Sequence, residues 1–151
     1  MMEVLIVIVL ISVLAGLAIP SLNQTYYKIL LDQSTNDLAY LMRYAQSRAI
    51  IQQRIVQWSF YSSRRSYSLQ QESPQVSDDV SGEKKFSLIH GRLGRMFKIP
   101  NELNLTAKSP SIQFYPDGKI DKANFLLCRK DRCLTISTKE QTGHVLVWEN
   151  P

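Results

Sequence analysis

The chain has 151 residues, 44% of them hydrophobic and 21% charged, and its formal net charge is +5. This length leaves room for one domain of roughly 100 residues beyond any anchor, which excludes several large domains, and neither repeats nor low-complexity tracts occur. The charge permits contact with anionic lipid or DNA, but it is not clustered enough to identify a partner.

An apolar run opens the chain. Residues 4–19 are all apolar except Ser12 and Gly16, and Glu3 is the only charge before Lys28. A helix that spans a bilayer needs about 20 residues at about 1.5 Å each, so the run is a borderline span. A signal peptide should carry basic residues before its apolar core and a small-residue cleavage site after it, and neither is present. An ordinary anchor remains, as does a helix that waits in the membrane before it packs against other copies.

Glu3 immediately precedes this apolar run. A charge at mid-bilayer costs a few kcal/mol on insertion scales, so the carboxylate lies at the headgroup level or is paired. At the headgroup level it complements the positive end of the helix dipole.

A helical pattern continues beyond Pro20, because small and apolar residues recur every three or four positions: Leu31, Ser34, Leu38, Leu41, Ala45 and Ala49. We expect one helix from near residue 2 to near residue 53, with its second half packed on a domain core. Pro20 removes one backbone donor and should kink or loosen the helix, and Gly16 weakens the same region.

After this helix the apolar period changes to two, which predicts strands. We expect a hairpin from 55–61 and 67–70, and strands at 86–89, 103–107, 111–115, 124–128, 133–137 and 144–148. Polar residues 71–85 predict a surface loop, and turns are expected at 116–118, 129–132 and 140–143. The expected fold class is α+β: a long N-terminal helix packed on a C-terminal antiparallel β-sheet domain.

The start of the chain also carries a motif, Glu3-Val4-Leu5-Ile6-Val7-Ile8, followed by an apolar stretch and Ile19-Pro20-Ser21-Leu22. It resembles the prepilin methylation motif of type IV pilins and of the pseudopilins of type II secretion. In that family a prepilin peptidase removes a basic leader, and the new N-terminal residue is methylated. Met1 stands here at the Leu position of the motif, so we interpret the start as a start codon assigned too far downstream or as a fragment. The peptidase is an expected partner if a leader lies upstream.

Two further segments resemble the GspH/FimT subgroup of minor pilins. Residues 45–50 match the Ala-Arg-Ser-Glu-Ala-Ile helix end except at Gln46 and Arg48. Residues 114–118 match the F-x-P-x-G turn, and Thr142-Gly143 matches the closing hairpin. The resemblance implies a pilin-like fold, with residues 1–22 as a transmembrane or filament-core helix and 23–151 as a periplasmic domain.

The resemblance implies a minor pseudopilin of the type II secretion system, a structural subunit of the periplasmic pseudopilus that drives protein secretion. The expected location is the bacterial inner membrane, which the chain crosses once, with the C-terminal domain in the periplasm. When assembled, the chain is expected in a filament. Other pseudopilin or pilin subunits are the expected partners, and Glu3, Gly16 and Pro20 the expected assembly residues. The alternative is a FimT-like minor type IV pilin for pilus assembly and DNA uptake. That branch tends to carry Gly-Arg-x-Arg in its closing hairpin, and residues 143–146 lack both arginines, which disfavours DNA uptake.

Two more residue sets are candidate sites. Cys128 and Cys133 flank a four-residue turn, where we favour a disulfide over two free thiols. So short a loop would mainly pin strand register. Basic loop residues offer weak candidates for DNA phosphate contact: Arg92, Arg95, Arg129, Lys130 and Arg132. The sequence shows neither a nucleophile beside a base nor four zinc ligands, so we expect no enzyme, metal or cofactor.

Overall fold

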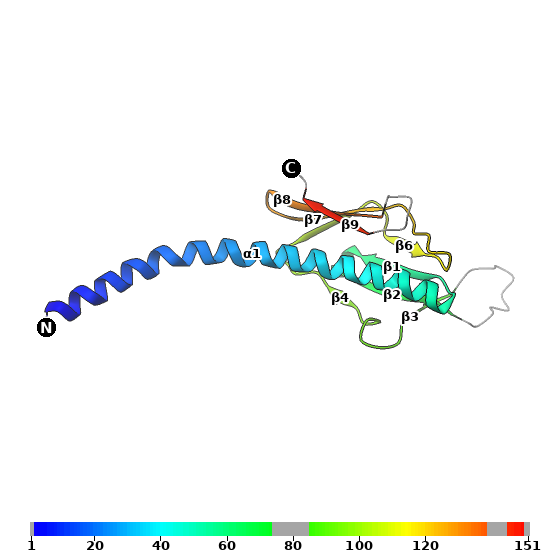
Figure 1. The fold of residues 1–151 in the computed structure, drawn as a ribbon, viewed down its shortest axis with the longest axis horizontal. Coiled ribbons are helices and arrows are strands. Elements are labelled where there is room, and N and C mark those ends of the chain that lie inside the picture. The colour runs from blue at the N-terminus through cyan, green and yellow to red at the C-terminus, as the bar shows by residue number, and fades with distance from the viewer. Residues whose placement is uncertain (1, 74–84, 139–144, 150–151) are drawn as a thin grey trace.

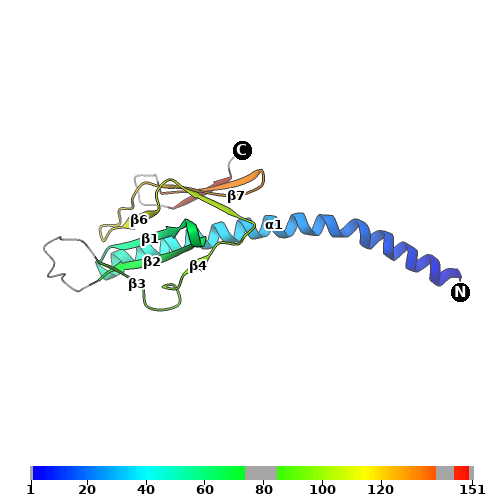
Figure 2. The same cartoon turned by 180° about the vertical axis from the view of Figure 1, so that it is seen from behind.

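The computed structural model describes residues 2–73, 85–138 and 145–149, with side chains described throughout except at 14–24. One helix, α1 (Met2–Gln52), runs through a third of the chain. Its N-terminal half projects as an arm, and its C-terminal half lies along two β-sheets (Figures 1 and 2). This confirms the predicted long helix. The helix is continuous across Pro20, and Figure 1 shows a gentle curve of the arm rather than a break.

The arm carries exposed apolar side chains. Those of residues 4–11 and of Val13 are each at least 52% exposed. Among the residues whose placement is described, no helix is both long and apolar enough to span a membrane.

The C-terminal half of α1 buries one side. Its buried residues lie mostly three or four positions apart: Leu31, Thr35, Leu38, Met42, Ala45 and Ala49. Alanine has no side chain beyond Cβ, so the strands can approach the helix closely at the last two positions. Thr35 is the polar member of the set, and its hydroxyl donates to the carbonyl oxygen of Leu31 at 2.8 Å. That bond satisfies the buried hydroxyl within the helix.

Two antiparallel sheets face α1. The first has the order β3-β2-β1-β6, with β4 also paired to β2; its strands are β1 (Val56–Tyr61), β2 (Ser66–Glu72), β3 (Phe86–Leu88), β4 (Phe97–Lys98) and β6 (Ser111–Phe114). The second has the order β5-β7-β8-β9; its strands are β5 (Asn104–Ala107), β7 (Asn124–Arg129), β8 (Arg132–Ser137) and β9 (Leu146–Glu149). A 3₁₀ turn, η1 (Ser62–Arg64), joins β1 to β2.

The core lies where both sheets meet α1. Trp58 of β1 and Phe125 of β7 are fully buried, and their rings pack edge to face with centroids 4.8 Å apart. Such aromatic pairs stabilise a core beyond the area that they bury. This contact joins the inner faces of the two sheets, so the domain has one shared core.

The predicted hairpin and strands are confirmed, with two differences. The loop predicted at 71–85 is wrong at its start, because β2 continues to Glu72, and its residues 74–84 lie outside the described residues. Gln71 is a buried strand residue whose Nε2 donates to Oε1 of Gln52 at 2.6 Å, while Nε of Arg48 donates to Gln71 Oε1 at 3.2 Å. Two polar side chains of α1 thus supply hydrogen-bond partners for the buried amide of Gln71.

The second difference is β4, which the sequence pattern did not predict. It has only two residues, too few for any period. Phe97 stacks on Tyr67 of β2 with ring centroids 5.5 Å apart, which holds the short strand against the sheet. The turn predicted at 140–143 and the Thr142-Gly143 match lie outside the described residues.

Candidate functional site

The arm is the first candidate surface. Glu3 is exposed in the first turn of α1, and the apolar residues after it are exposed on every side of the helix. The hydroxyl of Ser12 donates to the carbonyl oxygen of Ile8 at 2.8 Å, so the polar group within this apolar surface is satisfied by the helix itself. A helix that is apolar all round requires a lipid or protein environment.

The three predicted assembly residues share this helix but form no cluster. Gly16 and Pro20 lie one turn apart, while Glu3 lies about 20 Å from Gly16 along the axis at 1.5 Å per residue. The structure therefore does not bring the three residues into one site.

The turn at residues 114–118 docks on the C-terminal end of α1. Gly118 has φ +85° and its N–H donates to the carbonyl oxygen of Tyr115 at 3.0 Å. Its own carbonyl oxygen accepts a hydrogen bond from Nε2 of Gln46, also at 3.0 Å. Gln46 departs from the resembled motif, which has Arg there, but the amide keeps a donor at this position. The motif thus ties the turn to the helix.

The same turn holds an exposed ion pair. Nζ of Lys119 lies 2.7 Å from the Asp117 carboxylate, whose other oxygen accepts the Lys119 backbone N–H at 3.1 Å. The hydrogen bond from the Lys119 side chain, with that from its backbone, lowers the pKa of the Asp117 carboxyl. Being exposed, this pair closes the turn but adds little stability.

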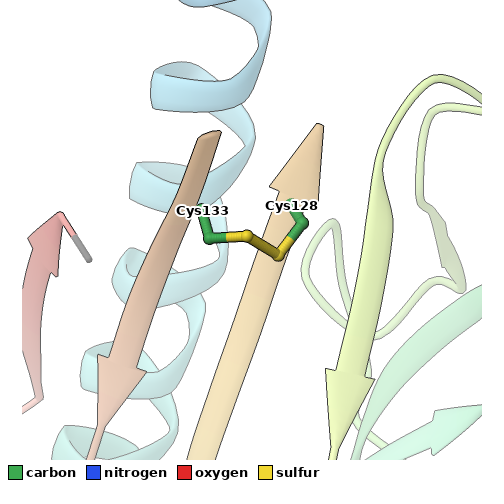
Figure 3. Close-up of a disulfide and its surroundings, with 2 residues drawn as sticks. All are labelled: Cys128 and Cys133. Carbon is green, nitrogen blue, oxygen red and sulfur yellow. A yellow bond between two sulfur atoms is a disulfide. The ribbon is translucent and has the colours of Figure 1, made fainter. Parts of the chain in front are cut away.

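The β7–β8 hairpin brings the two cysteines together. Cys128 pairs with Cys133 across the strands, their Cα atoms are 4.1 Å apart, and the sulfurs are bonded (Figure 3). Only Lys130 and Asp131 form the turn, and Lys130 has φ 49°. A disulfide one pair from a two-residue turn fixes the direction in which the tip points.

The tip of this hairpin rests on α1 through two arginines. The Arg129 guanidinium lies 3.3 Å from the centre of the Tyr27 ring, a close cation–π contact. Nη2 of Arg132 lies 3.3 Å from the Asp32 carboxylate. Both views place the tip at the end of the domain nearest the arm (Figures 1 and 2).

Arg132 also binds β9. Its Nε donates to Oε1 of Glu149 at 2.6 Å and its Nη2 to Oε2 at 3.3 Å, a bidentate pair. The hydrogen bond from Arg132, with its charge, lowers the pKa of the Glu149 carboxyl, and the bond to Glu149 raises the pKa of Arg132. The helix, the hairpin and β9 therefore meet at one guanidinium.

Sequence reasoning missed the partners in this cluster: Tyr27, Asp32 and Glu149. They are separated from Arg129 and Arg132 by most of the chain or by a strand, and no local spacing joins them. The position of Tyr27 and Lys28 just after the apolar run was the one available signal.

The five basic residues considered for DNA fall into two groups. Arg129, Lys130 and Arg132 form the hairpin tip, whereas Arg92 and Arg95 lie between β3 and β4, on the other side of α1 in both views (Figures 1 and 2). Arg95 stacks over Phe97, with its guanidinium 5.3 Å from the ring centre. The structure does not bring the set into one patch.

A mainly apolar groove of about 500 Å³ lies between α1 and residues 93–100. Burial, with the charge of Asp37 as a smaller cause, raises the pKa of Tyr67 at this groove to about 12. Its polar side chains form no nucleophile and base pair. Within 2–73, 85–138 and 145–149 no group of three or more potential metal ligands occurs.

A model of the family described as type II transport protein GspH matches residues 34–142. The fold is similar to that of the minor pseudopilin EpsH from the type 2 secretion system of Vibrio cholerae, with a TM-score of 0.60 and 9% sequence identity over 79% of this chain and 94% of that one. It is also similar to the type IV minor pilin FimU of Pseudomonas aeruginosa, with a TM-score of 0.53 and 16% identity over 80% of this chain and 92% of that one. No curated protein matches the chain. The pilin-like α+β fold is thereby shown.

Proposed function

We propose that this chain, which belongs to the GspH family of type II transport proteins, works as a minor pseudopilin of a type II secretion system. One observation carries the role of a pilin-like assembly subunit: an arm with apolar side chains exposed all round continues, as one helix, into a folded α+β domain. Such a surface needs a partner that is itself apolar. A bilayer supplies that environment before assembly, and the arms of other subunits supply it afterwards. The match to the type II transport family favours a secretion system as the place of that assembly.

In this mechanism the arm, together with the rest of residues 1–22, is held in the inner membrane while domain 23–151 stands in the periplasm. Assembly moves the arm from lipid into the core of a filament. Because the arm then leaves the headgroup region, the Glu3 carboxylate needs a new partner, and a positive group on a neighbouring subunit supplies it. The domain caps or primes the filament tip.

The test is Glu3→Ala in a secreting cell, with Glu102→Ala as a control at an exposed carboxylate of the domain. We expect the Glu3 variant to insert in the membrane like the unaltered chain, because loss of a charge does not weaken apolar burial. We expect its incorporation into filaments, measured by crosslinking to other subunits, to be abolished. Normal incorporation would refute the pairing of Glu3.

The similarity to FimU supports an alternative, a FimT-like minor type IV pilin that serves pilus assembly and DNA uptake. Both alternatives use the arm in the same way, so the arm does not discriminate between them. A shift of duplex DNA by the chain that weakens steeply with salt, at physiological ionic strength, would favour the alternative. Adjacent secretion genes would favour the pseudopilin.

A further inference from the structure

We propose that the hollow between α1 and the β7–β8 hairpin binds the phosphate of an anionic lipid headgroup while the arm is held in the membrane. The proposal rests on the membrane-held arm of the proposed function. It adds a second contact with the bilayer, made by the domain itself.

The first support is the lining of the hollow. It measures about 330 Å³ and is lined by Thr25, Tyr27, Lys28, Leu31, Arg129 and Arg132. Three of these six residues are cations, and none is a carboxylate. None of the nearby carboxylates lines the hollow, but Asp32 and Glu149 pair with Arg132. The charge of Glu149 also acts on Lys28. Arg129 has no carboxylate partner among these contacts, and Nη1 of Arg132 keeps a donor that the described residues leave unused. Lysine and arginine that converge on one space offer a phosphate both charge and hydrogen-bond donors.

The second support is the rigidity of the site. Arg129 is held over Tyr27, Arg132 is held by two carboxylates, and the disulfide fixes the hairpin that carries both. A preorganised cationic site loses less side-chain entropy on binding than mobile surface lysines do.

The third support is the distance of the hollow from the hydrocarbon region of the bilayer, measured along α1. The apolar run of 16 residues, 4–19, measures about 24 Å as a helix, less than the roughly 30 Å of hydrocarbon. A short span thins the bilayer and draws the following residues toward the headgroups. Lys28 lies nine residues, or about 14 Å, beyond Ile19, and Tyr26 and Tyr27 precede it as aromatic residues of the kind found at membrane interfaces. The hollow thus lies within reach of headgroup phosphates.

The experiment uses the full chain in vesicles of phosphatidylcholine alone or with 30 mol% phosphatidylglycerol. Flotation reports insertion of the arm. Acylation rates of single lysines, measured by mass spectrometry, report the contact. Lys28 lines the hollow, and Lys130 lies in the turn next to Arg129. Lys119 is the internal control, because its turn docks on Gln46, about 27 Å from Lys28 along α1.

We expect phosphatidylglycerol to slow acylation of Lys28 and Lys130 roughly fivefold and to leave Lys119 unchanged. Arg129→Gln should reduce this protection to less than twofold, whereas the matched Arg92→Gln on the other side of α1 should retain it. Salt at 0.5 M should remove the difference, because it shortens the range of the charge interaction.

Three results would overturn the proposal. If the chain floats with both vesicles but Lys28 and Lys130 react equally in both, the headgroup contact is wrong and the proposed function stands. If the chain floats with neither, the membrane-held arm fails and the headgroup contact fails with it. If duplex DNA or inorganic phosphate protects Lys28 on phosphatidylcholine vesicles as strongly as phosphatidylglycerol does, the hollow serves that ligand instead.

Discussion

At the residue scale, Gln46 shows how one side-chain donor joins a motif to the fold. Because its amide donates to the Gly118 carbonyl oxygen, we predict that Gln46→Glu destabilises the domain at pH 7 by about 1 kcal/mol, the net value of one hydrogen bond. Thermal unfolding measures this as a fall of roughly 2–4 °C in Tm. The introduced carboxyl regains a donor when protonated, so the deficit should shrink below about pH 4.

Two variants test the cause of that change. Gln46→Arg keeps a donor and should recover most of the loss. Gln33→Glu adds the same charge to an exposed position of α1 and should change Tm little. Equal losses from Gln33→Glu and Gln46→Glu would assign the effect to charge rather than to the bond.

Tyr67 gives a second prediction at this scale, in alkaline solution. Its folded pKa is about 12 against an ordinary 10, so its contribution to stability is fully present below pH 10 and is lost as pH rises toward 12. The free energy of unfolding should fall in this window by up to about 1.4 kcal/mol per pH unit. Tyr67→Phe keeps the stack on Phe97 and removes the hydroxyl that titrates. Denaturant melts at several pH values should therefore show a free energy of unfolding that falls less steeply with pH in this variant. Tyr40→Phe, at an exposed tyrosine, is the control, and an identical slope for both variants would contradict the assignment.

The residue scale also shows where sequence reasoning ends. A period of 3.6 residues predicts that α1 buries one side, but it does not predict that Thr35 rather than Ser34 lies there. The pairing of Asp32 with Arg132 joins residues 100 positions apart, and sequence spacing carries no information on such contacts. Gln71 is polar and buried because two α1 side chains bind it, which no local pattern encodes.

At the element scale, the β7–β8 hairpin is a short strand pair closed by a covalent bond. The loop between Cys128 and Cys133 is small, so the chain-entropy model gives the bond about 2 kcal/mol. We predict that a Cys128→Ala, Cys133→Ala double variant still unfolds cooperatively, with Tm lower by roughly 4–8 °C at most. Hydrogen exchange should quicken mainly in the tip, residues 129–132.

Reduction of the unaltered chain by dithiothreitol should reproduce the behaviour of the double variant. Agreement between the two samples would assign the effect to loss of the disulfide bond rather than to loss of the cysteine side chains. Loss of the cooperative transition in either sample would mean that the hairpin holds the whole second sheet together. Faster exchange throughout β5 and β9 would point the same way.

The elements were predictable to different degrees. Strand β1 alternates apolar and polar residues from Val56 to Phe60, so its period of two can be recognised in the sequence. Strand β7 is instead a continuous apolar run from Phe125 to Cys128, and only the fold shows that Phe125 and Leu127 are the buried positions. The two-residue β4 depends on the stacking of Phe97 on Tyr67, a tertiary contact. The division into two sheets depends on which strand pairs with which, and β6 returning to β1 rather than to β5 is a long-range choice.

At the scale of the whole molecule, the chain has two parts with opposite solvent requirements joined by one helix. The arm exposes apolar side chains, whereas the domain buries them around Trp58 and Phe125. The N-terminal motif made the pairing of such parts predictable, since the resemblance covers the arm, the helix end and the turn at 114–118. The hollow beside the hairpin was not predictable, because Lys28 and Arg129 come together only through the fold.

The continuity of α1 has a mechanical consequence. The helix lies along the sheets and is bonded to them at several levels: by Asp32 to Arg132, by Arg43 to the carbonyl oxygen of Val145, and by Gln46 to that of Gly118. A pull on the arm along its axis therefore loads these contacts together, in shear, instead of peeling them one after another. The domain can therefore follow its helix as one rigid body, and the force needed to separate the helix from the sheets exceeds the force that breaks any one of these contacts.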